Sequence, residues 1–186
     1  KLAGLAAERK PAWDTLSALL DHARTLPGAQ DLSTQTETVS KERRLLEPTD
    51  PVPAIRKQAA DLLRTALMAA HSAHTRVYEE QMAALVSSEV WQALDAGQQE
   101  TILKGEGILE IPQMAAGTEA ELLRALEETS LPGWKTRTDA LLQQFARAAL
   151  AAAKLLEPKT QQVHLTSGTL RTDEDVKAWL AAKETE

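Results

Sequence analysis

One uninterrupted stretch, residues 51–88, constrains the fold of this chain more than any other. After Pro53 it contains neither Gly nor Pro, and most of its residues are strong helix formers such as Ala, Leu, Arg, Gln and Glu. Asp50 is a favourable N-cap residue, and Pro51 suits the first helical position, where a missing N–H breaks no hydrogen bond. The stretch therefore predicts a single helix roughly 55 Å long, and other segments must pack along it.

Apolar residues spaced alternately three and four apart form a stripe on this predicted helix. The stripe consists of Ile55, Ala59, Leu62, Ala66, Ala69, Ala73 and Val77. Such spacing is typical of the seam of an antiparallel bundle or a short coiled coil. Because most of these side chains are small, we expect a neighbouring helix to approach closely.

A second long helix is predicted over residues 134–157, after the break at Pro132-Gly133. Its apolar face comprises Leu141, Phe145, Ala148, Ala152 and Leu155, with Leu142, Ala149 and Leu156 beside it. We expect this helix to be the antiparallel partner of residues 51–88, with the shorter helices in the connection between them.

Shorter helices account for the rest of the first 157 residues. We expect residues 1–9 to end a helix at Lys10-Pro11, and further helices over residues 11–25, 30–46, 89–94 and 98–105, with Gly97 between the last two. Residues 108–117 contain Pro112 and predict a packed connector. Thr118 and Glu121 have the spacing of a capping box, which begins another helix.

The character of the chain changes after Pro158. Residues 161–170 alternate polar and apolar side chains, which favours a short strand or extended arm. Thr172 and Asp175 then form a second capping-box pair at the start of a helix. The predicted fold is all-α: an elongated antiparallel helical bundle over residues 1–157, followed by a strand-like arm and helix over residues 158–186 that belong to a following domain.

Composition excludes several classes of protein. The 186 residues include no cysteine, which excludes a disulfide framework, a thiolate nucleophile and a zinc finger, and fits a reducing cytosol. The formal net charge of −6 argues against a general polyanion binder. No apolar run is long enough for a transmembrane helix. The first residues, KLAGLAAERK, lack an initiating Met and predict that the sequence is part of a longer chain.

Sequence motifs assign no catalytic, cofactor-binding or metal-binding residue. The chain has no P-loop motif and no HExxH motif, and the Gly105-Glu106-Gly107 segment lacks the lysine of a phosphate loop. His71 and His74 are spaced like helical metal ligands, but the second Glu-x-x-His of such sites is absent. We interpret both histidines as residues on a helix face that titrate near neutral pH.

Basic residues cluster around the proline-rich turn before residue 51. The cluster comprises Lys41, Arg43, Arg44, Arg56, Lys57 and Arg64. Two interpretations stay open. The cluster contacts a protein partner or the phosphates of a nucleic acid, or it is a solvated face that pairs with Glu37, Glu42, Glu47 and Asp61.

Three segments carry a resemblance to a known family. They are RRLLEPTDPVPAIRKQAADLLRTAL (43–67), EVWQALDAGQQETIL (89–103) and VHLTSGTLRTDEDVKAWLAAKE (163–184). In this order they resemble the C-terminal region of the large P-loop proteins of BREX phage-defence systems, BrxC and PglY. The resemblance implies a cytosolic helical region whose ATPase lies upstream, and partners among the other domains of that ATPase and other defence-system proteins.

Three functional hypotheses follow. The first is a non-catalytic helical scaffold or interaction domain of such an ATPase. The alternative is a helical arm that contacts nucleic acid through Arg43, Arg44, Arg56 and Lys57, with binding that weakens steeply as salt rises. The third is a stand-alone helical-bundle enzyme that uses a metal or carboxylates.

Overall fold

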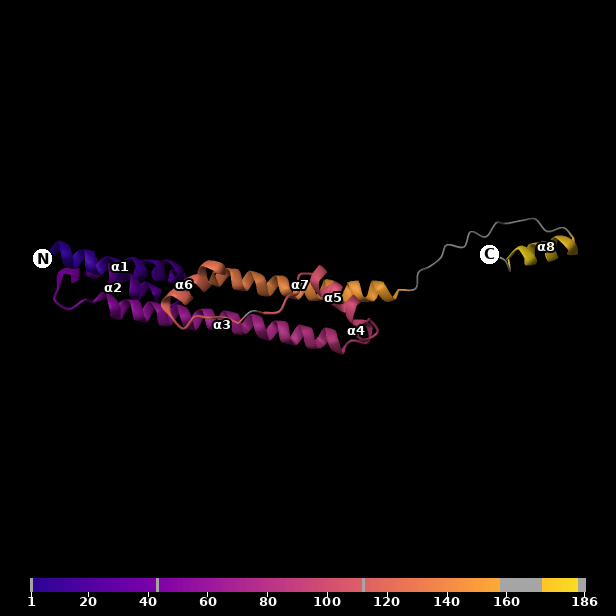
Figure 1. Ribbon diagram of the computed structural model, residues 1–186, viewed down its shortest axis with the longest axis horizontal. Helices are drawn as coiled ribbons and strands as arrows, with labels where there is room; N and C mark the ends of the chain where they lie inside the picture. The colour runs from indigo at the N-terminus through magenta and orange to yellow at the C-terminus, as the bar shows by residue number, and fades with distance from the viewer. Residues whose placement is uncertain (1, 43, 112, 158–171, 184–186) are drawn as a thin grey trace. The chain divides into compact units, whose positions relative to one another are not determined.

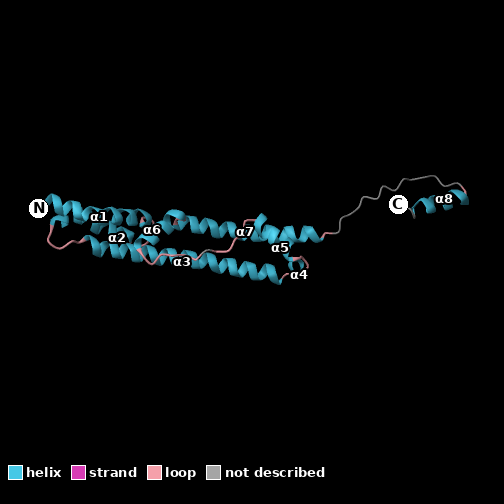
Figure 2. Cartoon of the chain, viewed as in Figure 1, coloured by secondary structure: helices cyan, strands magenta, loops and turns pink. Residues whose placement is uncertain are grey.

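A computed structural model describes residues 2–42, 44–111, 113–157 and 172–183 of the chain. All regular elements in these ranges are helices (Figures 1 and 2), as predicted for an all-α fold. The chain divides into two compact units, Lys1–Leu156 and Glu157–Glu186. The prediction placed this boundary one residue later. The predicted strand over residues 161–170 lies outside the described residues.

Helix α1 (Leu2–Ala23) continues through Pro11, where the sequence predicted a boundary. The Arg9 guanidinium donates hydrogen bonds to the backbone oxygens of Leu45 (2.7 Å) and Glu47 (2.9 Å). These contacts anchor the first part of α1 to the turn before the long helix. Their free energy helps to offset the cost of the backbone hydrogen bond that Pro11 cannot donate within a helix. Because α1 is continuous through Pro11, the predicted break at this position is wrong.

Helix α2 (Ala29–Lys41) begins after Gly28, which adopts a positive φ of 87°. The predicted helix over residues 30–46 is too long, because a separate 3₁₀ turn, η1 (Arg44–Leu46), follows α2. The carbonyl of Leu45 in this turn accepts the hydrogen bond from Arg9. Local helix propensity predicted that the helix would continue through residues 44–46. The contact from Arg9, distant in sequence, instead accompanies a separate 3₁₀ turn there.

Helix α3 (Val52–Ser87) is the predicted long helix, unbroken over 36 residues. The Asp50 carboxylate accepts a hydrogen bond from the Val52 N–H at 3.0 Å. Pro51 lies directly before the first helical residue instead of being that residue. The predicted extent of this helix is confirmed.

The buried face of α3 departs from the predicted stripe along its length. Ile55 and Ala59 are buried as predicted, whereas Ala73 is exposed and Leu63 and Leu67 are fully buried instead. A strict seven-residue repeat drifts about 20° per heptad around a straight α-helix. Over the roughly five turns from Ile55 to Ala73 this drift amounts to about 50°, so the predicted stripe gradually leaves the contact face of a straight helix.

Two short helices and a connector follow at the far end of α3. Ser88 caps α4 (Glu89–Gln92), and its hydroxyl accepts a hydrogen bond from the Trp91 N–H at 3.3 Å. Helix α5 (Ala96–Gly105) starts with a capping box made by Asp95 and Gln98. Gly97 is therefore inside α5 and does not separate two helices as predicted.

The connector, described over residues 107–111 and 113–118, leads back along α3 (Figure 1). Arg64 of α3 donates a hydrogen bond to the Ala116 carbonyl at 2.8 Å, which fixes the end of this connector. The predicted capping box then starts α6 (Glu119–Glu128): the Thr118 N–H donates to Glu121, and the Glu121 N–H donates to the Thr118 hydroxyl.

Helix α7 (Leu131–Leu156) starts three residues earlier than predicted. The Ser130 hydroxyl accepts a hydrogen bond from the Gly133 N–H at 3.2 Å. Pro132 lies in the first turn, where no N–H is needed for a helical hydrogen bond. The Pro132-Gly133 pair therefore belongs to the start of the helix instead of preceding it.

Helices α3 and α7 pack against each other as predicted, but they run parallel and not antiparallel. Trp134 contacts His71, Thr138 bonds to His74 and Phe145 contacts Tyr78, so residue numbers rise together along both helices. The reason is the connector. About a dozen residues in an extended conformation reach up to about 40 Å, enough to return the chain along α3 before α7 begins.

Two hydrophobic clusters lie along α3. The first cluster joins the N-terminal part of α3 to α1, α2 and α6, and its fully buried residues include Leu16, Leu19, Leu63 and Leu122. The second cluster joins the C-terminal part of α3 to α4, α5 and α7 through Leu85, Trp91, Ile102, Leu141 and Phe145. Trp91 is buried in the second cluster and Trp134 in the first.

The second unit contains α8 (Asp173–Lys183). Its predicted capping box is confirmed, since the Thr172 N–H donates to the Asp175 carboxylate (3.0 Å) and the Asp175 N–H donates to the Thr172 hydroxyl (3.2 Å).

Candidate functional site

Trp134, in the first turn of α7, occupies the point where α3, the connector and α6 meet. Its indole ring packs edge-on against the rings of His71 (centroids 5.2 Å apart) and His74 (5.3 Å) on α3. The Arg137 guanidinium lies over the same ring, 5.6 Å from its centroid. These contacts hold the ring in one orientation, with only 6% of the residue exposed.

The indole nitrogen of Trp134 has no hydrogen-bond acceptor, although it is buried. An indole Nε1–H is only a donor, and leaving a buried donor unpaired costs about 1–3 kcal/mol. Most buried polar groups in native proteins have a partner. The unpaired Nε1–H therefore marks this residue as a candidate for contact with a ligand.

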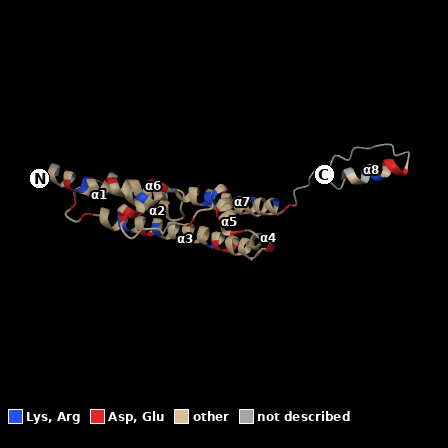
Figure 3. Cartoon of the chain, turned by 45° about the vertical axis from the view of Figure 1, so that its right-hand side comes forward, with Lys and Arg blue, Asp and Glu red and all other residues tan. Residues whose placement is uncertain are grey.

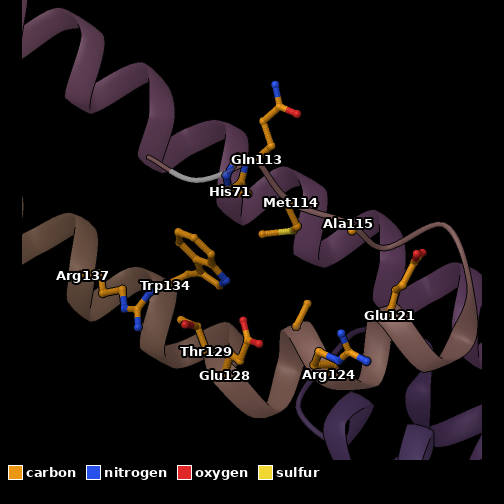
Figure 4. Close-up of a pocket in the computed structure, with 11 residues that line it drawn as sticks. His71, Gln113, Met114, Ala115, Glu121, Arg124, Glu128, Thr129, Trp134 and Arg137 are labelled. Atoms are coloured by element: carbon orange, nitrogen blue, oxygen red, sulfur yellow. The ribbon is translucent and has the colours of Figure 1, made fainter. Parts of the chain in front are cut away.

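A cavity of about 270 Å³ lies on one side of Trp134. Figure 4 shows the indole nitrogen directed toward the space enclosed by the connector and α6. The lining residues come from α3, the connector, α6 and α7: His71, Gln113, Met114, Ala115, Glu121, Arg124, Ala125, Glu128, Thr129, Trp134 and Arg137. We refer to this space as the indole cavity.

A second cavity of about 370 Å³ shares Trp134 and Arg137 with the first. Its other walls include His74 and Tyr78 of α3 and Gly107 at the start of the connector. Gly107 has a positive φ of 71°, which a residue with a side chain adopts only with strain. This residue lets the connector turn back beside α7.

The charged residues around Trp134 differ in whether they have a hydrogen-bond or ion-pair partner. The Glu121 carboxylate accepts the Thr118 N–H at 2.9 Å, and this backbone hydrogen bond is the largest cause of its lowered pKa. Arg124 and Arg137 form no ion pair with a carboxylate among the described residues. Two guanidinium groups at the indole cavity are therefore available to an anion.

Burial changes the titration of the side chains that α3 presents to this region. It lowers the pKa of His74 below 6.5, and the nearby charges of His71 and Arg137 lower it further. His74 Nδ1 lies 3.0 Å from the Thr138 hydroxyl. The pKa of Tyr78 is raised, mainly by burial and then by the charge of Glu110.

Every described residue of the predicted basic cluster forms an ion pair with a carboxylate. Lys41 pairs with Glu37 (2.8 Å), Arg44 with Glu47 (3.2 Å), Lys57 with Asp61 (3.0 Å), Arg64 with Asp61 (2.8 Å) and Arg56 with Glu119 (3.2 Å). Arg43 lies outside the described residues. Figure 3 shows basic and acidic residues interspersed along these helices. The contact with a partner or nucleic acid stays a prediction.

The pairing of Arg56 was not anticipated from the sequence. Its partner, Glu119, is in the first turn of α6, far from it in the chain. Arg64 likewise reaches the Ala116 carbonyl as well as Asp61. Both arginines therefore fasten α3 to the returning connector and α6, which is a structural role.

The histidines do not converge with acidic groups. In the part of the chain that the structure describes, no three His, Asp or Glu side chains gather in a way that could hold a metal ion. His71 and His74 instead pack on the Trp134 ring.

The outer face of α7 carries exposed leucines, two of which, Leu142 and Leu156, were predicted to lie beside its buried face. Leu142 is 46% exposed, Leu150 55% and Leu156 43%. Together with Ala146, Ala149 and Ala153 they follow helical spacing along one side of α7, which adjoins the buried face near Phe145 at Leu156 and lies opposite Leu141 at Leu150. We call this set the α7 outer stripe.

Within the described residues, none of the helices has the length and apolar character needed to span a bilayer. No protein-family model matches the sequence, and neither a curated protein nor a solved structure shows a significant match to it. The candidate sites therefore rest on the geometry of this chain alone.

Proposed function

We propose that this chain is a non-catalytic helical scaffold and interaction domain of a larger P-loop ATPase in a BREX-type phage-defence system in the cytoplasm. The resemblance of residues 43–67, 89–103 and 163–184 suggests the family. The α7 outer stripe is the observation that carries the interaction role, since it leaves several large apolar side chains in water on one helix face.

The rest of the described surface favours binding of another protein over binding of a nucleic acid. The described cations of the predicted basic cluster all pair with carboxylates, so this cluster offers little free positive charge to a nucleic acid. The α7 outer stripe instead offers an apolar strip of the kind that helices bury against other helices.

The first test is the reading frame that contains this chain. The proposal expects a P-loop motif upstream in the same frame, and methyltransferase or phosphatase genes nearby. A complete frame without a P-loop would refute the assignment to this family. ATP hydrolysis by the purified chain alone would refute a non-catalytic role.

The second test addresses the α7 outer stripe in the full-length protein. We expect Leu142→Gln, Leu150→Gln and Leu156→Gln, combined, to lower protection against phage, measured as efficiency of plating, with normal protein levels. Leu155→Gln is the matched control, because Leu155 is 55% exposed but points to another side of α7. Equal loss in the control, or no loss in the triple variant, would contradict the proposal.

A further inference from the structure

We propose that the indole cavity binds a small carboxylate whose apolar body lies against Trp134. The site is separate from the α7 outer stripe and does not depend on the proposed interaction role. Three features of the cavity lead to this ligand: unused donors, an apolar wall and limited space.

The donors come first. Trp134 is 6% exposed and its Nε1–H is buried without an acceptor, while Figure 4 shows the nitrogen directed into the cavity. Arg124 and Arg137 bring two further groups that only donate. Six other described arginines, by contrast, pair with carboxylates. The cavity thus gathers donors that need an acceptor with negative charge, and carboxylates suit guanidinium groups well.

The apolar wall and the volume of the indole cavity limit which carboxylates can bind. Met114, Ala115, Ala125 and the indole ring give the cavity an apolar side, which favours a ligand with an apolar body. A volume of about 270 Å³ is close to the lower end of small-molecule sites. Glu121 and Glu128 also line the cavity, and their negative charges disfavour a doubly charged phosphate more than a singly charged carboxylate.

Access to the indole nitrogen requires a small adjustment. The flexible side chain of Met114 lies on the wall of the same cavity (Figure 4). Methionine has three rotatable bonds and adapts to what it packs against. We infer that Met114 moves when the acceptor enters, while the rings of His71 and His74 keep the Trp134 ring in place.

Phenylacetate is the probe, because it joins a carboxylate to a small aromatic body. The full chain is titrated with phenylacetate, and binding is measured by calorimetry and by NMR of the four indole N–H signals. We expect saturable binding that shifts one indole signal. Trp134→Phe keeps an aromatic ring but removes the N–H, so it identifies that signal and is expected to weaken binding about tenfold.

Matched variants and ligands separate the proposal from its competitors. Arg124→Gln is expected to weaken binding, whereas Lys135→Gln, which changes the net charge equally at a neighbouring exposed position, is expected to leave it unchanged. Phenylacetamide, the neutral analogue, is expected to bind more weakly. If Trp134→Phe does not fold, as judged by circular dichroism, Arg124→Gln on the exposed rim decides the test.

Several results would overturn the proposal. They are absence of saturable phenylacetate binding, equal binding by phenylacetamide, and equal binding by the Trp134→Phe or Arg124→Gln protein. Inorganic phosphate that binds as tightly as phenylacetate would also overturn it, because the apolar wall would then contribute nothing.

Discussion

Leu63, in the N-terminal part of α3, offers a direct test of the first hydrophobic cluster. It is fully buried among residues from α1, α2 and α6. Replacing Leu63 with Ala removes three carbon atoms, which costs about 2 kcal/mol of transfer free energy. The space left behind raises the expected loss to about 3 kcal/mol of the free energy of unfolding, within the measured range for such changes.

The assay is urea unfolding followed by circular dichroism and tryptophan fluorescence. Trp134 belongs to the first cluster and Trp91 to the second, so fluorescence of single-tryptophan variants distinguishes the two parts. Leu150→Ala is the control, since Leu150 is 55% exposed and its removal should change stability by less than about 0.5 kcal/mol. A loss in Leu63→Ala no larger than in this control would refute the packing described for α3.

Three further predictions follow from the same structure. Thr118→Ala removes the acceptor of the capping box and should lower stability by about 1 kcal/mol, measured by urea unfolding against Ser72→Ala on the exposed face of α3. Because the folded pKa of His74 lies below 6.5, its contribution to stability is complete above that pH and is lost as pH falls toward the lowered value. The drop in melting temperature between pH 7.5 and 5.5 should therefore shrink in His74→Asn; an unchanged drop would contradict it. Cysteines at positions 74 and 138, in a chain without native cysteine, should be joined by a short thiol cross-linker, whereas an antiparallel α7 should give no such product.

Local signals in the sequence predicted the starts of several helices. Thr118 and Glu121 form the expected capping box, as do Thr172 and Asp175. These pairs act within one helical turn, so their geometry follows from spacing alone. The long helix α3 was predicted for a similar reason, because no residue after Pro53 interrupts it.

Contacts between distant residues account for the errors. Pro11 remains inside α1 because Arg9 binds the turn at Leu45. The direction of α7 depends on how far residues 107–118 extend, and no periodic pattern encodes that distance. The prediction put Leu155 on the buried face of α7 and Leu142 and Leu156 beside it, but all three are exposed. Helical spacing gives relative positions on a helix and not which side, or how much of its length, meets a neighbour.

The candidate site was largely invisible in the sequence. Trp134 is the first residue of the predicted second long helix, and it is buried. Its unpaired Nε1–H and the cavity beside it arise where four segments meet, so no local motif reports them. The Pro132-Gly133 pair was the nearest signal, because it lies in the first turn of the helix that carries the tryptophan.

The returning connector has a consequence for synthesis of the chain. Ala116, Leu122, Leu126 and Trp134 complete the first cluster, yet a ribosome makes them long after α1, α2 and α3. Until these residues emerge, the side chains of α3 that they cover stand open to water and to other nascent chains. A chain truncated after Gly105 should therefore expose these apolar side chains and be retained by chaperones, although it already contains α1, α2 and α3.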